Sequence, residues 1–130
     1  MKNTRKTNYA IGDFLIQLKN ASMAKNKEVV FANNKKIVAI AKVLEKMGFL
    51  DNVKVQKESI TVGLTFKNKR PLLANVKLIS KPGLRIYMQV DEIEKKKGPS
   101  DFLISSPKGM ISSREAVKNR VGGEVIAEIL

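Results

Sequence analysis

Apolar residues recur at the i, i+3, i+4, i+7 spacing of an amphipathic helix in two segments of the chain. The first segment predicts a helix over about residues 9–21, with apolar positions at Ile11, Phe14, Leu15 and Leu18. The second has its apolar face at Ile37, Ile40, Ala41, Leu44 and Met47. Asn34 is a favourable N-cap and Gly48 suits a left-handed C-cap, so we predict the second helix between these two residues.

Alternation of apolar and polar positions predicts strands in the rest of the first half. A short strand is expected around Val29–Phe31, and a hairpin is expected with its turn at Gln56–Ser59. The apolar positions of this hairpin are Val53, Val55, Ile60, Val62, Leu64 and Phe66. Asn68–Pro71 breaks the pattern and marks the expected boundary between two subdomains.

The second half alternates in shorter segments. Strands are expected around residues 74–78, at Leu84–Val90, at Phe102–Ile104 and at Val125–Leu130. Pro82-Gly83 fits a type II turn before the second of these strands. Residues 91–98 are expected to form a helical turn followed by a loop. The capping-box spacing of Ser112 and Glu115 predicts a short helix at Ser113–Asn119.

These elements indicate an α/β (α+β) protein of two small subdomains. Residues 1–70 are predicted to form an α-β-α-β-β unit, and residues 71–130 a mostly antiparallel β unit with a short helix. With 130 residues, of which 43% are hydrophobic, the chain can bury one core or two halves that share an interface.

The charge balance favours a polyanionic partner. The chain has 25 Lys and Arg against 12 Asp and Glu, a net charge of +13. Residues 1–75 hold 15 basic and 5 acidic groups, a net charge of +10, and residues 76–130 hold 10 and 7, a net charge of +3. Nucleic acid fits because neutralising phosphates releases condensed counterions. A membrane surface would attract the same charge, but the longest apolar run, Ile37–Ala41, is far too short to span a bilayer, and we expect no membrane partner.

The chain contains no cysteine and no histidine, which excludes several kinds of catalytic and metal site. Without cysteine there are no disulfides or thiolate zinc sites, and without histidine there are no imidazole bases. We therefore predict no cofactor, no metal site and no catalytic residue. The first eight residues are polar and basic, which argues against a secretory signal and favours the cytosol.

Several residues could contact a nucleic acid, and each also has a plainer interpretation. Tyr87 lies between Arg85 and Gln89 on the polar side of its predicted strand, so it could stack on an unpaired base or pack on a second face. Lys2, Arg5 and Lys6, like the lysines of the second helix, could contact phosphates or be simply solvated. The bend Ser105–Gly109 exposes hydroxyls, a cation and bare backbone, although serine, proline and glycine are also ordinary turn formers.

Three motifs, taken in order, resemble those of one family. Residues 105–116, Ser-Ser-Pro-Lys-Gly-Met-Ile-Ser-Ser-Arg-Glu-Ala, resemble a Ser-Thr-Ser-Lys-Gly-(Ile/Val)-Met-(Ser/Thr)-x-(Arg/Lys)-Glu-Ala signature. Residues 121–125, Val-Gly-Gly-Glu-Val, are similar to a closing Gly-Gly-Glu-(Val/Ile) motif. Residues 80–87, Ser-Lys-Pro-Gly-Leu-Arg-Ile-Tyr, resemble a central Ser-(Lys/Arg)-Pro-Gly-Leu-Arg-(Val/Ile)-Tyr segment. The family is that of the bacterial small-subunit ribosomal protein S8, and the resemblance covers essentially the whole chain.

The resemblance implies a function. It implies a structural constituent of the ribosome, not an enzyme, that is located in the cytoplasm within the small ribosomal subunit. Its partners would be the central domain of small-subunit (16S-type) ribosomal RNA, which it would bind early in assembly, and neighbouring small-subunit proteins. In some bacteria the family also represses translation of its own operon by binding a messenger RNA stem, and the resemblance leaves open whether this chain does so.

The resemblance also implies the contact residues. The main RNA-binding surface falls on Ser105, Ser106, Lys108 and Gly109, with Gly123 and Glu124 beside them. Short hydroxyls can bond base edges or ribose, and Lys108 attracts phosphate. Glu124 is expected to accept from a base amino group or a ribose hydroxyl, or to orient a cation. A second patch would comprise Lys81, Arg85 and Tyr87, and a third Lys2, Arg5 and Lys6.

The sequence departs from the family pattern at three places. Pro107 stands where the family has a second serine in the bend, so one hydroxyl and one N–H are missing there. The N-terminal segment lacks the usual Asp-Pro start, and Gly12 costs about 1 kcal/mol of helix stability relative to alanine. Residues 126–130 lack the common Cys-Tyr and final aromatic residue.

Two other function classes compete with this interpretation. A nucleoid-type DNA-binding protein would share the charge but would not prefer a structured RNA stem. A serine-lysine hydrolase would use Ser105 or Ser106 with Lys108.

Overall fold

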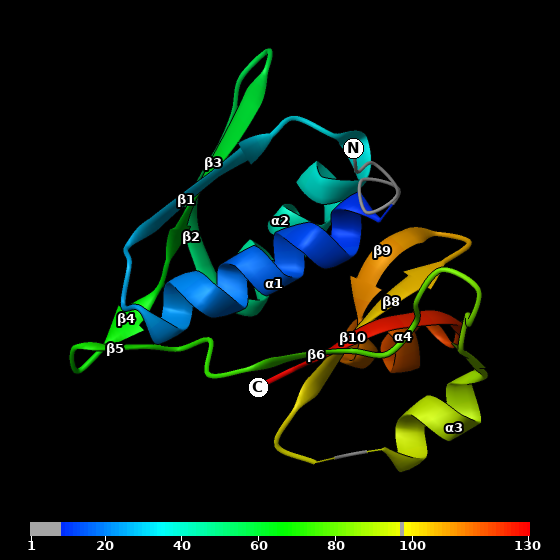
Figure 1. Ribbon diagram of the computed structural model, residues 1–130. Coiled ribbons are helices and arrows are strands. Elements are labelled where there is room, and N and C mark those ends of the chain that lie inside the picture. Colours follow the sequence, from blue (N-terminus) through cyan, green and yellow to red (C-terminus); the bar gives the residue numbers. More distant parts are fainter. Residues whose placement is uncertain (1–8, 97) are drawn as a thin grey trace.

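The computed structural model describes residues 9–96 and 98–130 (Figure 1). Lys2, Arg5 and Lys6 therefore lie outside the described residues. In chain order the elements are α1 (Ala10–Met23), β1 (Glu28–Ala32), α2 (Lys35–Met47), β2 (Leu50–Val55), β3 (Ser59–Leu64), β4 (Phe66–Lys67), β5 (Arg70–Pro71), β6 (Val76–Leu78), β7 (Tyr87–Met88), α3 (Val90–Lys95), β8 (Asp101–Ser106), β9 (Gly109–Ser112), α4 (Ser113–Asn119) and β10 (Gly123–Ile129). The mixed α+β fold predicted from the sequence is confirmed.

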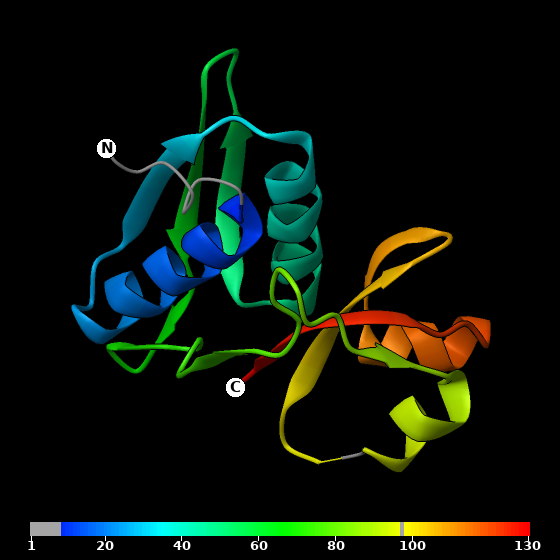
Figure 2. The ribbon, with the colours of Figure 1, turned by 45° about the vertical axis from the view of Figure 1, so that its right-hand side comes forward.

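The N-terminal half contains two helices beside an antiparallel sheet of order β1-β3-β2 (Figure 2). The Asn34 side chain accepts a hydrogen bond from the Lys36 N–H at 2.9 Å, and Gly48 ends α2 with φ 95°, as predicted. The turn between β2 and β3 is also confirmed, since the Gln56 N–H donates to the Ser59 carbonyl at 2.8 Å. Within the described ranges, no helix has the length and apolar character needed to cross a membrane.

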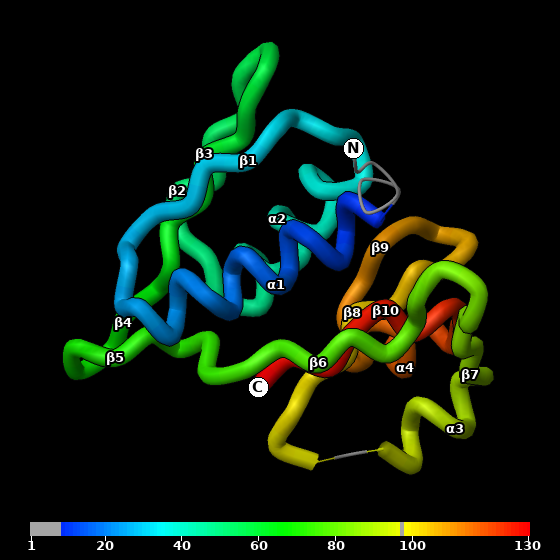
Figure 3. The backbone as a smooth tube through the Cα atoms, in the orientation of Figure 1, coloured from blue at the N-terminus to red at the C-terminus, as the bar shows by residue number. Residues whose placement is uncertain are grey.

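The C-terminal half is a sheet of order β6-β10-β8-β9, and β7 also pairs with β10. The last strand of the chain is thus the centre of its sheet, and β6 runs beside it although the two are far apart in sequence (Figure 3). The short helix α4 begins as predicted, because Ser112 Oγ accepts a hydrogen bond from the Glu115 N–H at 3.2 Å.

Two hydrophobic clusters hold these elements together. The larger one is centred on α1, α2 and the first sheet, and it continues into the second sheet through Leu73, Val76, Leu103, Ile126, Ala127 and Ile129. The smaller one packs α3 and α4 on the other face of the second sheet and consists of Ile93, Ile104, Ile111, Ala116 and Val125. The two halves therefore share one continuous core.

The predicted strands of the C-terminal half are partly wrong. The segment Leu84–Val90 does not form one strand: only Tyr87–Met88 pairs with another strand, Leu84 is 59% exposed and bridges back to Lys81, and α3 already begins at Val90. The segment 109–112 was not predicted as a strand, yet it pairs with β8 as β9, and β10 begins two residues earlier than expected, at Gly123.

Candidate nucleic-acid interface

Three predicted contact residues form one row across the second sheet. Glu124 on β10 lies directly opposite Tyr87 on β7, and on its other side directly opposite Ser105 on β8. Residues directly opposite in antiparallel strands project from the same face of the sheet. Segments from three distant parts of the sequence thus present an aromatic ring, a carboxylate and a hydroxyl together.

The opposite face of this sheet is buried. The neighbouring row consists of Val125, Ile104 and Ile111, which pack against Ile93 of α3 and Ala116 of α4. The alternation of strand side chains therefore directs the Tyr87–Glu124–Ser105 row away from α3 and α4. Tyr87 is 68% exposed, which suits a ring that stacks on a partner.

The bend between β8 and β9 is an exposed two-residue loop. Ser106 lies opposite Gly109, and Pro107, Lys108 and Gly109 are all exposed. Ser106 Oγ accepts a hydrogen bond from the Lys108 backbone N–H at 3.1 Å and donates one to the Gly109 carbonyl at 2.8 Å. Gly109 has φ 110°, a conformation that side chains disfavour. The Ser106 hydroxyl therefore uses its one hydrogen to shape the loop.

The Gly-Gly pair before β10 permits close contact between backbones. A Cβ on Gly123 would lie 2.3 Å from the Ser105 carbonyl oxygen, and one on Gly122 would lie 2.4 Å from the Met88 carbonyl oxygen. Both distances are far below contact distance, so neither position accommodates a side chain without movement of the strands. Gly123, predicted as an RNA contact, has at least this structural role.

Arg85 is brought to the same row by an ion pair. Its Nη1 atom lies 3.1 Å from Oε2 of Glu124, and the side chains are 49% and 14% exposed. Lys81 precedes the Pro82-Gly83 turn, where Gly83 has φ 83° as the predicted turn requires, and its backbone bridges to Leu84. All three members of the second predicted patch, Lys81, Arg85 and Tyr87, are exposed on this loop and strand.

A cationic cleft of about 470 Å³ lies next to the row. Lys35 and Lys36 line it from the first turn of α2, Tyr9 and Ala10 line it from the start of α1, and Arg85 contributes from the loop before β7. The N-terminus of a helix carries partial positive charge, so the two helix starts, Lys35 and Lys36 reinforce each other for an anion, and Arg85, which is paired with Glu124, adds less. The lysines of the second helix were considered for phosphate contact from sequence, but their position beside Arg85 was not predicted.

Tyr9 was missed by the sequence interpretation. Its hydroxyl donates a hydrogen bond to the Ser80 carbonyl, and its ring lies where a Cβ on Gly12 would be, 2.4 Å from the nearest ring atom. Burial raises the pKa of Tyr9 above its usual value of 10.0, while Arg85 opposes this rise and Glu124 adds to it. The glycine three residues after an aromatic residue at the helix start was the available sequence clue, and it explains why Gly12 is tolerated in α1.

The hydrolase alternative finds no support in the geometry of the bend. A serine-lysine nucleophile needs the ammonium group within hydrogen-bond reach of the hydroxyl. Ser106 instead bonds the backbone N–H of Lys108, and the Lys108 side chain makes no hydrogen bond to either serine in the part of the chain that the structure describes.

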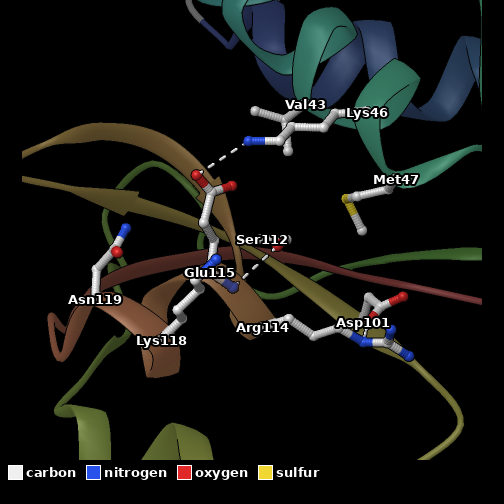
Figure 4. Close-up of a pocket in the computed structure, with 9 residues that line it drawn as sticks. All are labelled: Val43, Lys46, Met47, Asp101, Ser112, Arg114, Glu115, Lys118 and Asn119. Carbon is white, nitrogen blue, oxygen red and sulfur yellow. Dashed lines mark hydrogen bonds and ion pairs between the residues drawn. The ribbon is translucent and has the colours of Figure 1, made fainter.

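A second groove, of about 460 Å³, separates α2 from α4 (Figure 4). An ion pair between Lys46 and Glu115 crosses it at 3.3 Å, and a second pair joins Arg114 to Asp101 at 3.5 Å. These two ion pairs neutralise four of the charged side chains of the groove, and Lys118 adds one further cation to its lining. Of the residues considered for phosphate contact it contains Lys46, and none of the described residues of the predicted RNA-binding patches lines it.

The comparisons with known proteins agree with one another. The family model described as "Ribosomal protein S8" matches residues 9–130. Proteins called small ribosomal subunit protein uS8 are similar to this chain over most of their length. The one from Roseiflexus castenholzii is 36% identical over 128 residues, which cover 94% of this chain and 97% of the relative. The one from Spiroplasma kunkelii is 36% identical, covering 92% and 95%, and the one from Acinetobacter baylyi is 38% identical, covering 90% and 93%.

Proposed function

This chain belongs to the ribosomal protein S8 family, a family of structural, non-enzymatic proteins of the small ribosomal subunit, and we propose on that premise that it is a primary binder of the central domain of small-subunit ribosomal RNA. Binding would direct early assembly of the subunit. The observation that carries the proposal is the row of Tyr87, Glu124 and Ser105, which three separate segments bring to one sheet face beside a cationic cleft.

The row suits a distorted RNA stem better than a regular duplex. A-form RNA hides its base edges in a narrow groove, so proteins read the shallow groove or unstacked bases. Tyr87 offers a ring for stacking, Ser105 a hydroxyl for a base edge or ribose, and Glu124 a carboxylate that accepts from a base amino group. The Arg85–Glu124 ion pair at 3.1 Å holds both side chains in place before RNA arrives, which lowers the entropic cost of binding.

Phosphate contacts would come from the surroundings of the row. Lys108 lies at the tip of the exposed bend, Lys81 on the turn before β7, and Lys35 and Lys36 in the cationic cleft. Each supplies salt-dependent attraction without reading sequence. Lys2, Arg5 and Lys6 are proposed to add to this attraction, because the chain enters α1 at Tyr9, which itself lines the cleft.

The decisive experiment is a binding competition between a ribosomal RNA stem and duplex DNA. The chain should bind a central-domain stem of small-subunit ribosomal RNA, and an equal concentration of duplex DNA of the same length should not displace it. Displacement by the DNA would reject the proposal and favour a nucleoid-type protein. Tyr87→Ala should weaken binding to the stem by about 1–3 kcal/mol, because a stacked base is lost.

A pair of matched lysines tests the position of the surface. Lys108 and Lys118 are both exposed, the first on the bend and the second on α4 beneath the sheet. Lys108→Ala should reduce the slope of log affinity against log salt by about one unit, and Lys118→Ala should leave it unchanged. Equal slopes for both variants would remove the bend from the interface.

We consider two further kinds of partner, namely neighbouring proteins and a messenger RNA. We propose that neighbouring small-subunit proteins contact the parts of the chain that RNA leaves open. We also propose that a messenger RNA stem of the same shape, including one from the protein's own operon, competes for the row and represses translation. Competition between the two stems for one site, measured in solution, tests this second proposal.

A further inference from the structure

The hydroxyl of Ser80 is completely buried and holds the loop that carries Lys81, Arg85 and Tyr87. Ser80 has no exposed surface. Its Oγ donates to the Val125 carbonyl at 2.6 Å and accepts from the Ile86 N–H at 3.0 Å. One side chain thus links the start of the loop, at residue 80, to its end, at residue 86, and links both to β10. A buried hydroxyl with good partners fixes its surroundings more strongly than an exposed one does.

Ser80 also contacts the N-terminal half of the molecule. The Tyr9 hydroxyl, at the start of α1, donates to the Ser80 carbonyl. The Ile86 carbonyl in turn accepts from the Val125 N–H at 2.8 Å, which completes the connection between the loop and β10. Three elements that border the candidate interface, namely α1, the loop over residues 81–86 and β10, therefore meet at Ser80.

We infer that Ser80 is a positioning residue for RNA binding: its buried hydroxyl sets where Arg85 and Tyr87 lie relative to Glu124, and its carbonyl sets the start of α1 against the same surface. This inference rests on the proposed function and goes beyond it, because Ser80 itself is inaccessible to RNA. Affinity depends on it because a loop that is ordered in advance loses less entropy on binding.

Two buried serines provide a matched test. Ser22 is 5% exposed, and its hydroxyl donates to the Leu73 carbonyl at the far end of α1. Ser80→Ala and Ser22→Ala each remove one buried hydroxyl and should lower the melting temperature to a similar extent. Only Ser80→Ala should weaken binding to the ribosomal RNA stem, by about tenfold or more. If the two variants bind within twofold of each other, the inference is wrong.

A double variant distinguishes positioning from general loss of structure. In an Arg85→Ala/Tyr87→Ala background, the loop has lost the side chains through which Ser80 acts, so adding Ser80→Ala should cause no further loss of affinity. A further loss equal to that in the wild-type background would overturn the inference. If Ser80→Ala does not fold, Ser80→Cys keeps a small side chain in place of the hydroxyl, with only a weak donor, and carries the same expectation.

Hydrogen exchange on the protein without RNA separates this inference from the proposed function. The Ile86 amide donates to Ser80 Oγ, so its exchange should accelerate by about tenfold or more in Ser80→Ala and should not change in Ser22→Ala. An unchanged Ile86 amide would refute the positioning role. Failure of the wild-type chain to bind the stem, with the Ile86 effect present, would instead refute the proposed function.

Discussion

The two antiparallel sheets of this protein differ in how their strands are supplied by the chain. The first sheet is assembled from strands within residues 28–64, and its hairpin joins β2 to β3 by a short turn. The second sheet has the final strand, β10, at its centre, paired with β6, β7 and β8. Local contacts can build the first sheet early, whereas the second requires closure of long loops and a complete C-terminus.

The outer faces of the two sheets differ as well. The first sheet buries its inner face on α1 and α2. Neither the cationic cleft nor the groove between α2 and α4 is lined by residues of this sheet. The second sheet buries one face on α3 and α4, and its other face is covered in part by the larger cluster and carries the row of Tyr87, Glu124 and Ser105, in which Tyr87 is the exposed member. The candidate interface therefore lies on the sheet whose strands come from the most distant parts of the chain, and its geometry depends on strand pairing more than on any single segment.

The largest expected effect comes from two matched core residues, one in each sheet. Ile60 on β3 and Ile104 on β8 are both completely buried. Substitution by alanine should cost roughly 2–5 kcal/mol of unfolding free energy at either position, measured by urea denaturation. Ile104→Ala should also reduce the RNA affinity of the folded protein, because Ile104 holds β8 on the smaller cluster directly before Ser105. Equal RNA affinities for the two variants would show that the interface does not depend on that cluster.

Two glycines, one in each sheet, test the same difference between the sheets with a smaller expected loss of stability. A Cβ on Gly63 would lie 2.8 Å from the Asp51 carbonyl oxygen, and one on Gly123 would lie 2.3 Å from that of Ser105. Either alanine variant should cost roughly 1–3 kcal/mol, because the strands must separate. Gly123→Ala should in addition shift Glu124 away from Ser105 and weaken RNA binding. Gly63→Ala should leave the affinity unchanged, and a loss of affinity there would mean that the first sheet also contributes to the interface.

Two lysines of α2 test whether the cationic cleft belongs to the interface. Lys35 lines the cleft, whereas Lys42 is exposed further along the same helix and is absent from the cleft lining. Lys35→Ala should reduce the salt dependence of RNA binding by about one unit, and Lys42→Ala should not. Identical slopes would restrict the interface to the second sheet.

The smallest expected effect concerns pH. Because the pKa of Tyr9 is raised above 10.0 by burial, the folded protein holds the phenol proton more tightly than the unfolded chain does. The stability from this group is fully present below pH 10 and is lost as the pH rises through the raised pKa. Tyr9→Phe should cost about 1 kcal/mol at neutral pH through the lost hydrogen bond, and it should flatten the decline in stability above pH 10. Parallel alkaline declines in urea unfolding for both proteins would contradict this assignment.

Much of the N-terminal half could be predicted because its determinants are local. The apolar spacing of Phe14, Leu15 and Leu18, the cap at Asn34 and the left-handed Gly48 act within a few residues of each other, and the structure confirms each. In the C-terminal half, the cap at Ser112 and the turn at Gly83 were predicted for the same reason. The strand expected over Leu84–Val90 failed, because alternation alone cannot reveal whether a partner strand is present.

By itself the sequence determined the fold class, the ends of α2 and α4, the positive charge and the motifs that identify the family. Only the tertiary structure decided that Tyr87, Glu124 and Ser105 share one row, that Gly123 is required by the Ser105 backbone, and that Tyr9 and Ser80 join the two halves. The physical reason is distance along the chain. Propensity, capping and turn chemistry act over a few residues, whereas strand pairing and burial join positions that no local pattern relates.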